Sequence, residues 1–137
     1  MDVYERSTRA ARVRKLWKRL GTVDGFMEGA SIFSDSDDDR AYFVNGTQVA
    51  NLVGDSVALR LTRKVVSAHR ARLKAEPSVD LLRSGSDWIG VSVTTARDAD
   101  LVLELAALVA EAHLPSPGTP VKPPPEGAEL ARRRRFH

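Results

Sequence analysis

The residues best suited to chemistry lie in the stretch RSGSDW, residues 83–88, which leads into an alternating strand. This stretch gathers a guanidinium, two hydroxyls, a carboxylate and an indole. Small-molecule pockets combine apolar or aromatic walls with a few convergent polar groups, so Trp88 beside Arg83 and Asp87 could form the floor of one. The same residues also make a good hairpin connection, because Gly85 supplies a φ angle that other residues avoid. We favour the turn and keep the pocket as the alternative.

The three histidines of the chain do not fall into pairs that could bind a metal or exchange protons. His69 lies four residues from both Val65 and Leu73 on one helix face, which indicates a structural place beside the core. No nucleophile elbow or acid–base pair can be assembled from the spacings, so no catalytic residue is assigned and enzymatic activity stays open. The candidate ligand-binding residues are Trp88, Arg83, Asp87, Arg60 and His69.

The acidic run SDSDDD places Asp35, Asp37 and Asp39 at the first three ligand spacings of an EF-hand. Arg40 then stands where that loop needs a glycine, and Gly46 stands where it needs a bidentate glutamate. The run therefore predicts a solvated acidic loop. With no cysteine in the chain, disulfides and thiolate sites are excluded, and we expect neither a metal nor a cofactor.

Both ends of the chain are basic. Residues 1–20 carry seven Arg and Lys against two acidic residues, and four arginines lie at 132–135 before Phe136. Such runs can bind phosphates, and an aromatic residue can stack on a base, although a solvated basic tail is the interpretation we favour. The candidate nucleic-acid contacts are Arg12, Lys15, Arg19, Arg132, Arg133, Arg134 and Arg135.

The 137 residues fit a single domain of ordinary globular composition, with 42% hydrophobic and 28% charged residues. No apolar run is long enough to span a membrane, and the basic N-terminus has no apolar signal-peptide segment. We therefore expect a cytoplasmic protein that does not bind membranes, either a monomer or a homodimer.

Three helices are expected. Val13, Leu16 and Leu20 follow the spacing of one helix face, which predicts a helix over residues 3–20 that stops at a glycine. Thr62 is placed to cap a second helix over residues 63–75. A third helix, capped by Thr95 or by Asp98 itself, runs to residue 113 and is apolar enough to be almost wholly buried.

Five strands are expected. Asn45-Gly46 between two β-prone runs predicts a type I′ hairpin, and a third strand follows over residues 57–61. A second hairpin turns around residues 84–87. Residues 21–39 are predicted to be loop, with a short strand near Ile32. The order α-β-β-β-α-β-β-α predicts an α+β fold, an antiparallel five-stranded sheet with helices packed on one face.

Six of the seven prolines lie after residue 113. Proline fixes φ and removes an amide donor, so residues 114–137 are predicted to form an extended, free, Pro-rich and Arg-rich tail. We accordingly divide the chain into a basic N-terminal helix at 1–20, an α+β domain at 21–113 and the tail at 114–137.

Four segments together resemble the luciferase-domain proteins, a small bacterial family with actinobacterial members: FVNGTQVANL, VALRLTR, SGSDWIGVSV and DADLVLELAALVAEAH. The proline-rich, arginine-tipped ending is also similar, so the resemblance spans roughly residues 20–137. It implies no flavin site. Members often carry histidines in the second strand, where this chain has Asn51, which removes any role that rests on that histidine. The layout also resembles the MmcQ/YjbR-like α+β domains, which are described as DNA-binding; this likeness is one of layout alone.

Three functions follow as expectations. The first is a module that binds a small molecule or a protein partner. The second is a nucleic-acid-associated module that uses the two basic ends. The third, implied by the family name, is a cofactor-independent oxygenase, which would require an enclosed apolar cavity.

Overall fold

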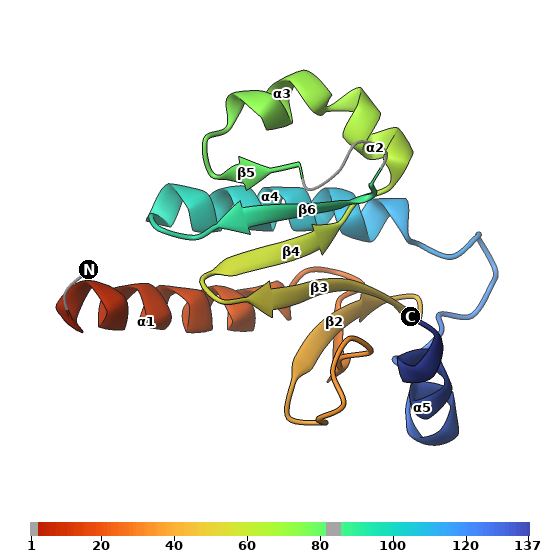
Figure 1. The fold of residues 1–137 in the computed structure, drawn as a ribbon. Helices are drawn as coiled ribbons and strands as arrows, with labels where there is room; N and C mark the ends of the chain where they lie inside the picture. Colours follow the sequence, from red (N-terminus) through yellow and green to blue (C-terminus); the bar gives the residue numbers. More distant parts are fainter. Residues whose placement is uncertain (1–2, 82–85) are drawn as a thin grey trace.

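The computed structural model describes residues 3–81 and 86–137 and has an α+β fold (Figure 1). A six-stranded antiparallel sheet runs in the order β1-β2-β3-β4-β6-β5. The elements are α1 (Val3–Leu20), β1 (Met27–Ala30), β2 (Arg40–Val44), β3 (Thr47–Val53), β4 (Ser56–Arg60), α2 (Arg63–Ala68), α3 (Arg70–Ala75), β5 (Val79–Asp80), β6 (Trp88–Ser92), α4 (Ala96–Ala112) and α5 (Gly127–Phe136).

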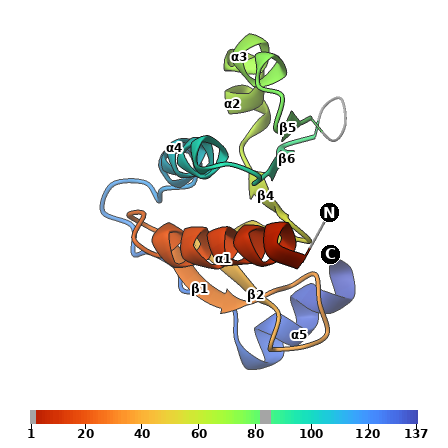
Figure 2. The ribbon, with the colours of Figure 1, turned by 90° about the vertical axis from the view of Figure 1, so that its left-hand side faces the viewer.

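Helices α1 and α4 cover one face of the sheet (Figure 2). Strand alternation explains this layer, because Leu59 and Ile89 lie opposite each other on neighbouring strands and are fully buried on the covered face. Leu16 of α1 and Leu105 of α4 belong to the same apolar cluster. Arg60 and Trp88, also opposite each other, lie on the other face. None of the helices in the described part of the chain is long and apolar enough to cross a membrane.

The hairpin between β2 and β3 confirms the expected turn. Asn45 has φ 50° and Gly46 has φ 78°, the positive values that a type I′ turn requires at its two central residues. Thr62 caps α2 through its side chain. Thr95 caps α4 and forms a capping box with Asp98, so Thr95 is the cap and Asp98 is the third residue of the first turn.

Two predicted features of the elements were wrong, and a third is not tested. The sheet has six strands, because residues 27–30 pair with β2 and the strand expected near Ile32 lies earlier in the chain. The helix expected over 63–75 is two short helices, because His69 leaves the helical region with ψ 14°. The second predicted hairpin turns around residues 84–87, and residues 84 and 85 of that turn lie outside the described residues.

The predicted free tail was also wrong in part. Residues 114–126 contain no helix or strand, as their prolines require, but the chain then forms α5 and buries Leu130. The last proline is Pro125, and the following residues include the good helix formers Ala, Glu, Leu and Arg. Helix α5 lies on the face opposite to α1 and α4, so helices occupy both sides of the sheet (Figure 2).

Candidate functional site: a cleft beside Asn51

Three of the predicted ligand-binding residues lie together. Arg60 donates from Nε to the Asp87 carboxylate at 2.8 Å, and Trp88 is directly opposite Arg60 in the sheet. The Trp88 ring meets the Phe33 ring edge-on, with centroids 5.6 Å apart. His69 lies at the junction of α2 and α3, and no described contact joins it to this group. Arg83 lies outside the described residues.

The described part of RSGSDW, residues 86–88, bonds to other groups of the protein. Ser86 accepts a hydrogen bond from the Trp88 amide at 3.1 Å, and the Asp87 carboxylate is occupied by Arg60. The Arg60 and Asp87 side chains are each about one-third exposed, at 38% and 32%. A partly exposed ion pair of this kind organises the surface and leaves little free bonding capacity for a ligand.

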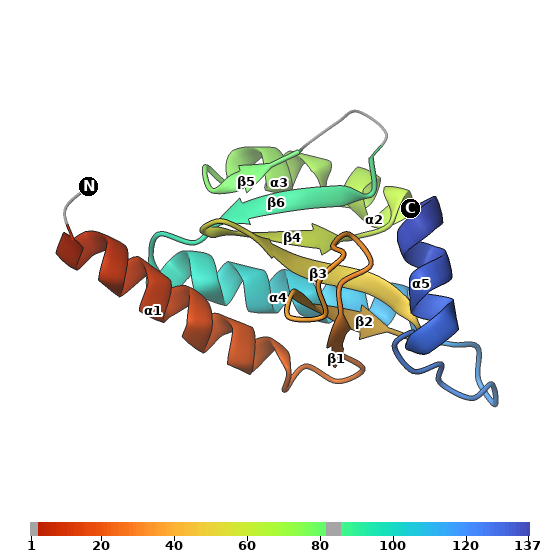
Figure 3. The same cartoon turned by 60° about the horizontal axis from the view of Figure 1, so that its bottom comes forward.

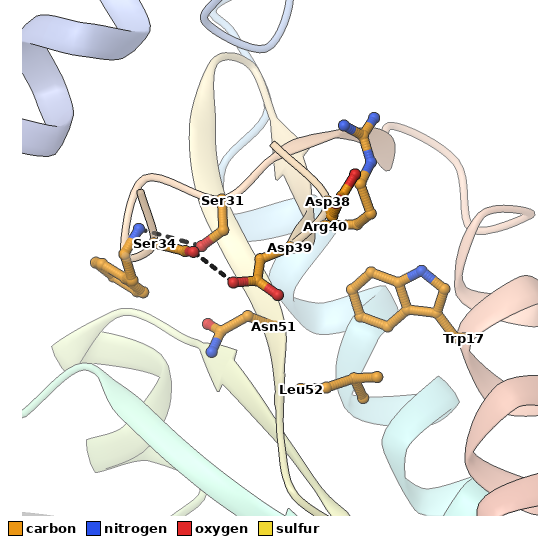
Figure 4. Close-up of a pocket in the computed structure, with 9 residues that line it drawn as sticks. Trp17, Ser31, Ser34, Asp38, Asp39, Arg40, Asn51 and Leu52 are labelled. Carbon is orange, nitrogen blue, oxygen red and sulfur yellow. Dashed lines mark hydrogen bonds between the residues drawn. The ribbon is translucent and has the colours of Figure 1, made fainter. Parts of the chain in front are cut away.

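A cleft of about 490 Å³ opens elsewhere on the sheet (Figure 4). It lies between α1, β3 and residues 31–39, which we call the acidic loop. Strand register explains the hollow: Ala41 near the start of β2 is opposite Asn51, whereas β3 continues beyond Asn51 to Val53. The lining residues are Trp17, Ser31, Phe33, Ser34, Asp38, Asp39, Arg40, Asn51 and Leu52.

Asn51 is the chemically unusual member of this lining. Its Oδ1 atom is buried and accepts no hydrogen bond within the described residues. The Asp39 carboxylate comes from the opposite wall toward the same space, and it accepts a hydrogen bond from the Ser34 hydroxyl (Figure 4). Buried acceptors are nearly always paired in folded proteins, so this unpaired Oδ1 atom is an unusual feature of the cleft wall.

The acidic loop is held by the buried side chain of Gln48. Its Oε1 accepts from the Ile32 amide at 2.8 Å, and its Nε2 donates to the Ser31 hydroxyl at 3.1 Å. The Ser31 amide donates across the loop to the Asp39 carbonyl at 2.8 Å. A buried amide that satisfies two loop groups fixes where the loop leaves the sheet. Asp39 and Asn51 are therefore positioned by one strand, β3.

The cleft has an acidic balance. The Arg40 guanidinium points out of it (Figure 4). It pairs with Glu28 at 3.4 Å, and the same carboxylate accepts a hydrogen bond from the Trp17 indole N–H at 3.1 Å. Asp38 and Asp39 therefore dominate the charge on the loop side. Trp17 and Leu52 supply an apolar wall opposite. The arrangement offers acceptors and apolar surface, which suits a small ligand that carries hydrogen-bond donors.

The predicted nucleic-acid residues are largely engaged by the protein itself. Arg12 donates to the Thr94 carbonyl at 2.6 Å, and Arg19 lies 3.9 Å from Asp100. Lys15 is exposed beside them, and all three line a groove of about 300 Å³ between α1 and α4. In α5, Arg132 and Arg133 pair with Glu129, Arg134 pairs with Asp37, and Arg135 lies over the Phe136 ring.

Sequence reasoning did not find the Asn51 cleft. Asn51 was singled out only as a departure from the family that the chain resembles, and Trp17 was not among the candidate residues. One signal was present: Gln48 and Asn51 are polar residues within the otherwise β-prone run TQVANLV. The closure of the cleft by the acidic loop depends on contacts between residues far apart in the chain.

No protein-family model, curated protein or solved structure matches the chain.

Proposed function

We propose that this protein is a binding module for a small molecule, and that its ligand is a compact organic amine held in the Asn51 cleft. The observation that carries the proposal is the buried, unpaired Oδ1 of Asn51 beside the Asp39 carboxylate. A buried acceptor without a partner costs about 1–3 kcal/mol. A protonated amine supplies up to three donors and a charge that complements Asp38 and Asp39. Its apolar part would lie against Trp17 and Leu52.

The two other expected functions receive less support. A nucleic-acid module needs free cations, and Arg132, Arg133 and Arg134 all bind groups of the protein itself. A cofactor-independent oxygenase needs an enclosed apolar cavity, whereas the Asn51 cleft is open and lined by carboxylates and hydroxyls. The resemblance to luciferase-domain proteins is compatible with a binding module and adds no catalytic residue to it.

Three probes of similar shape test the proposal: benzylamine, benzyl alcohol and benzoate, titrated against the 15N-labelled protein by NMR. Benzylamine should shift the side-chain amide signals of Asn51 and the indole N–H of Trp17, and benzoate should not. Asn51→Leu keeps the size but removes the acceptor, and it should weaken benzylamine binding by roughly tenfold, the loss that corresponds to about 1.4 kcal/mol.

Asp35→Asn is the matched control, because Asp35 is an exposed acid of the same loop that does not line the cleft. It should bind benzylamine as the wild type does. Equal shifts from all three probes would contradict the amine and leave only an unspecific cleft. Absence of any shift at Asn51 and Trp17 would overturn the binding function itself.

A further inference from the structure

The C-terminal helix returns to the wall of the Asn51 cleft. Helix α5 and the acidic loop lie on the same side of the sheet (Figures 2 and 3). Arg134 makes the connection: its Nη1 donates to the Asp37 carboxylate at 2.9 Å, its Nε to the Ser31 carbonyl at 3.2 Å, and its Nη2 to the Ser36 carbonyl at 3.3 Å. One planar guanidinium thus binds three points of the loop, a geometry that lysine cannot reproduce.

Arg134 is the well-buried arginine among the ion pairs of α5. Its side chain is 15% exposed, compared with 56% for Arg132 and 29% for Arg133. Asp37, its partner, is 78% exposed, so the ion pair alone is worth little in water. The two carbonyl contacts matter more for position, because they fix the backbone of the loop at Ser31 and Ser36. Ser31 itself lines the cleft.

A second set of contacts attaches the returning chain to the β2–β3 turn. The Lys122 amide donates to the Asn45 side-chain oxygen at 2.9 Å, and Arg133 donates to the Gly46 carbonyl. Leu130 is buried, yet it lies outside the apolar cluster that joins α1, the sheet and α4. The returning segment is thus held by these polar contacts and by two buried apolar residues, Leu130 and Pro125. Neither belongs to the main apolar cluster, so release of α5 would leave that cluster intact.

The end of the chain also supports an aromatic wall residue. The His137 ring lies 5.2 Å from the Phe33 ring, which in turn contacts Trp88. Phe33 lines the cleft and is 44% exposed even with this support. Two residues of the cleft, Ser31 and Phe33, are thus contacted directly from the C-terminal segment.

We propose that α5 is a clasp that holds the acidic loop in its cleft-forming position, with Arg134 as the positioning residue. When α5 is docked, the acidic loop forms the cleft wall that carries Ser31, Phe33 and Asp39. When α5 is released, the loop loses this position. The effect on the ligand rests on the function proposed above, whereas the effect on the loop does not. The clasp makes ligand binding depend on residues that do not touch the ligand, because docking of α5 and binding of the ligand both require the same position of the acidic loop.

Hydrogen exchange of the loop amides tests the clasp without any ligand. Arg134→Leu should speed exchange at Ser31 and Ile32 by about tenfold or more. The amides of these two residues donate the hydrogen bonds that close the loop, and these bonds break when the loop opens. The urea midpoint should change little, because the main core does not include α5. Arg134→Lys should restore part of the protection, and Arg135→Leu, the matched control, should leave exchange unchanged.

Benzylamine titration then reads the consequence for the cleft. Arg134→Leu should weaken benzylamine binding several-fold, and Asp37→Asn, which removes only the exposed side of the ion pair, should weaken it less. Unchanged loop exchange in Arg134→Leu would overturn the clasp. Faster exchange with unchanged benzylamine affinity would overturn its link to the cleft. A wild type that fails to bind benzylamine would defeat the proposed function alone, because the exchange experiment still decides the clasp.

Discussion

The hydroxyl of Tyr42 completes the end of α1. The last four carbonyls of a helix have no partner within it. Here the Gly21, Thr22 and Val23 amides bind the last three, and the Tyr42 hydroxyl donates to the remaining one, that of Trp17, at 2.5 Å. The Tyr42 and Trp17 rings are in contact, with centroids 4.4 Å apart. One side chain therefore fixes both the end of α1 and the indole that lines the cleft.

Tyr42→Phe should lower the free energy of unfolding by about 1–2 kcal/mol, because the Trp17 carbonyl is left without a donor. Urea unfolding followed by fluorescence measures this change, and near-UV circular dichroism checks that the aromatic packing survives. A change below a few tenths of a kcal/mol would show that water replaces the hydroxyl.

Burial, helped by the nearby Glu28 carboxylate, raises the pKa of Tyr42 above 10. The unfolded chain then ionises first, so the tyrosine should also reduce stability as the pH rises above about 10.

The buried Asp98 carboxylate holds the first turn of α4. One oxygen accepts from the Thr94 hydroxyl at 2.8 Å and from the Thr94 and Thr95 amides at 3.0 Å each. Burial by itself raises the pKa of Asp98, but these hydrogen bonds outweigh it and the net shift is downward. Such a group stabilises the fold above the ordinary carboxyl pKa, and the stabilisation is lost as the pH falls through the lowered value.

Asp98→Asn should therefore destabilise the protein by about 1 kcal/mol or more at neutral pH, the usual size of a lost helix cap. The gap between variant and wild type should narrow as the pH falls below about 4, where the wild-type carboxylate becomes protonated. Thermal unfolding at a series of pH values measures both effects. A gap that stays constant over the acid range would show that the charge of Asp98 has no part in the cap.

At the scale of elements, α5 should be separable from the rest of the fold. Leu130→Ala removes its single buried apolar side chain. We expect trypsin to cut at Arg132–Arg135 much faster in this variant, while the melting temperature stays within a few degrees of the wild type. Ala131→Gly, at an exposed position of the same helix, is the control for helix propensity. Equal cleavage of Leu130→Ala and the wild type would show that polar contacts alone hold α5.

The elements that sequence predicted well are those with a local cause. The bounds of α1, the Asn45-Gly46 turn and the Thr62 and Thr95 caps follow from residues within a few positions of one another. Strand β1 was missed because MEGA has no alternating pattern and forms only by pairing with β2. Helix α5 was missed because its burial depends on contacts with residues some hundred positions away, such as Ser31.

The candidate site also has a part that the sequence predicted and a part that it did not. Arg60, Asp87 and Trp88 were candidates for one ligand pocket, and the structure places them together. Asp87 and Trp88 are neighbours in the sequence, but the pairing of β4 with β6 that brings Arg60 to them was not predicted. The Asn51 cleft lies between α1, the acidic loop and β3, and no local sequence pattern predicts that these three segments lie together. Its two best clues, Gln48 and Asn51, are recognisable as polar side chains in a strand, but their roles depend on the loop that folds over them.

For the molecule as a whole, the acidic loop and the arginines of α5 neutralise each other in part. The net charge is only +3, yet Asp37 pairs with Arg134, and Glu129 pairs with Arg132 and Arg133. These two arginines lower the pKa of Glu129 to about 2, so the contacts within α5 persist through mildly acidic pH. We therefore expect the basic end of the sequence to be a weaker site for polyanions in the folded protein than in the released segment.

Release of α5 should reverse this effect. A Glu129→Gln, Leu130→Ala double variant should bind short duplex DNA several-fold more tightly than the wild type at low salt, because it frees three arginines. The difference should disappear at about 0.5 M salt, where charge interactions are screened. Fluorescence anisotropy with a labelled duplex measures it. Equal affinity of the two proteins at low salt would mean that the arginines of docked α5 are already available to phosphate.

The Asn45-Gly46 turn bears on how the protein ages. In an asparagine followed by glycine, the glycine amide nitrogen readily attacks the side-chain carbonyl carbon and expels ammonia, which gives a cyclic imide. Water then opens that imide to aspartate or isoaspartate. That same side-chain oxygen receives the Lys122 amide, and the Gly46 carbonyl receives Arg133. Deamidation at this one dipeptide would thus disturb the β2–β3 turn and the attachment of the C-terminal segment at the same time. The loss would increase with the age of the protein.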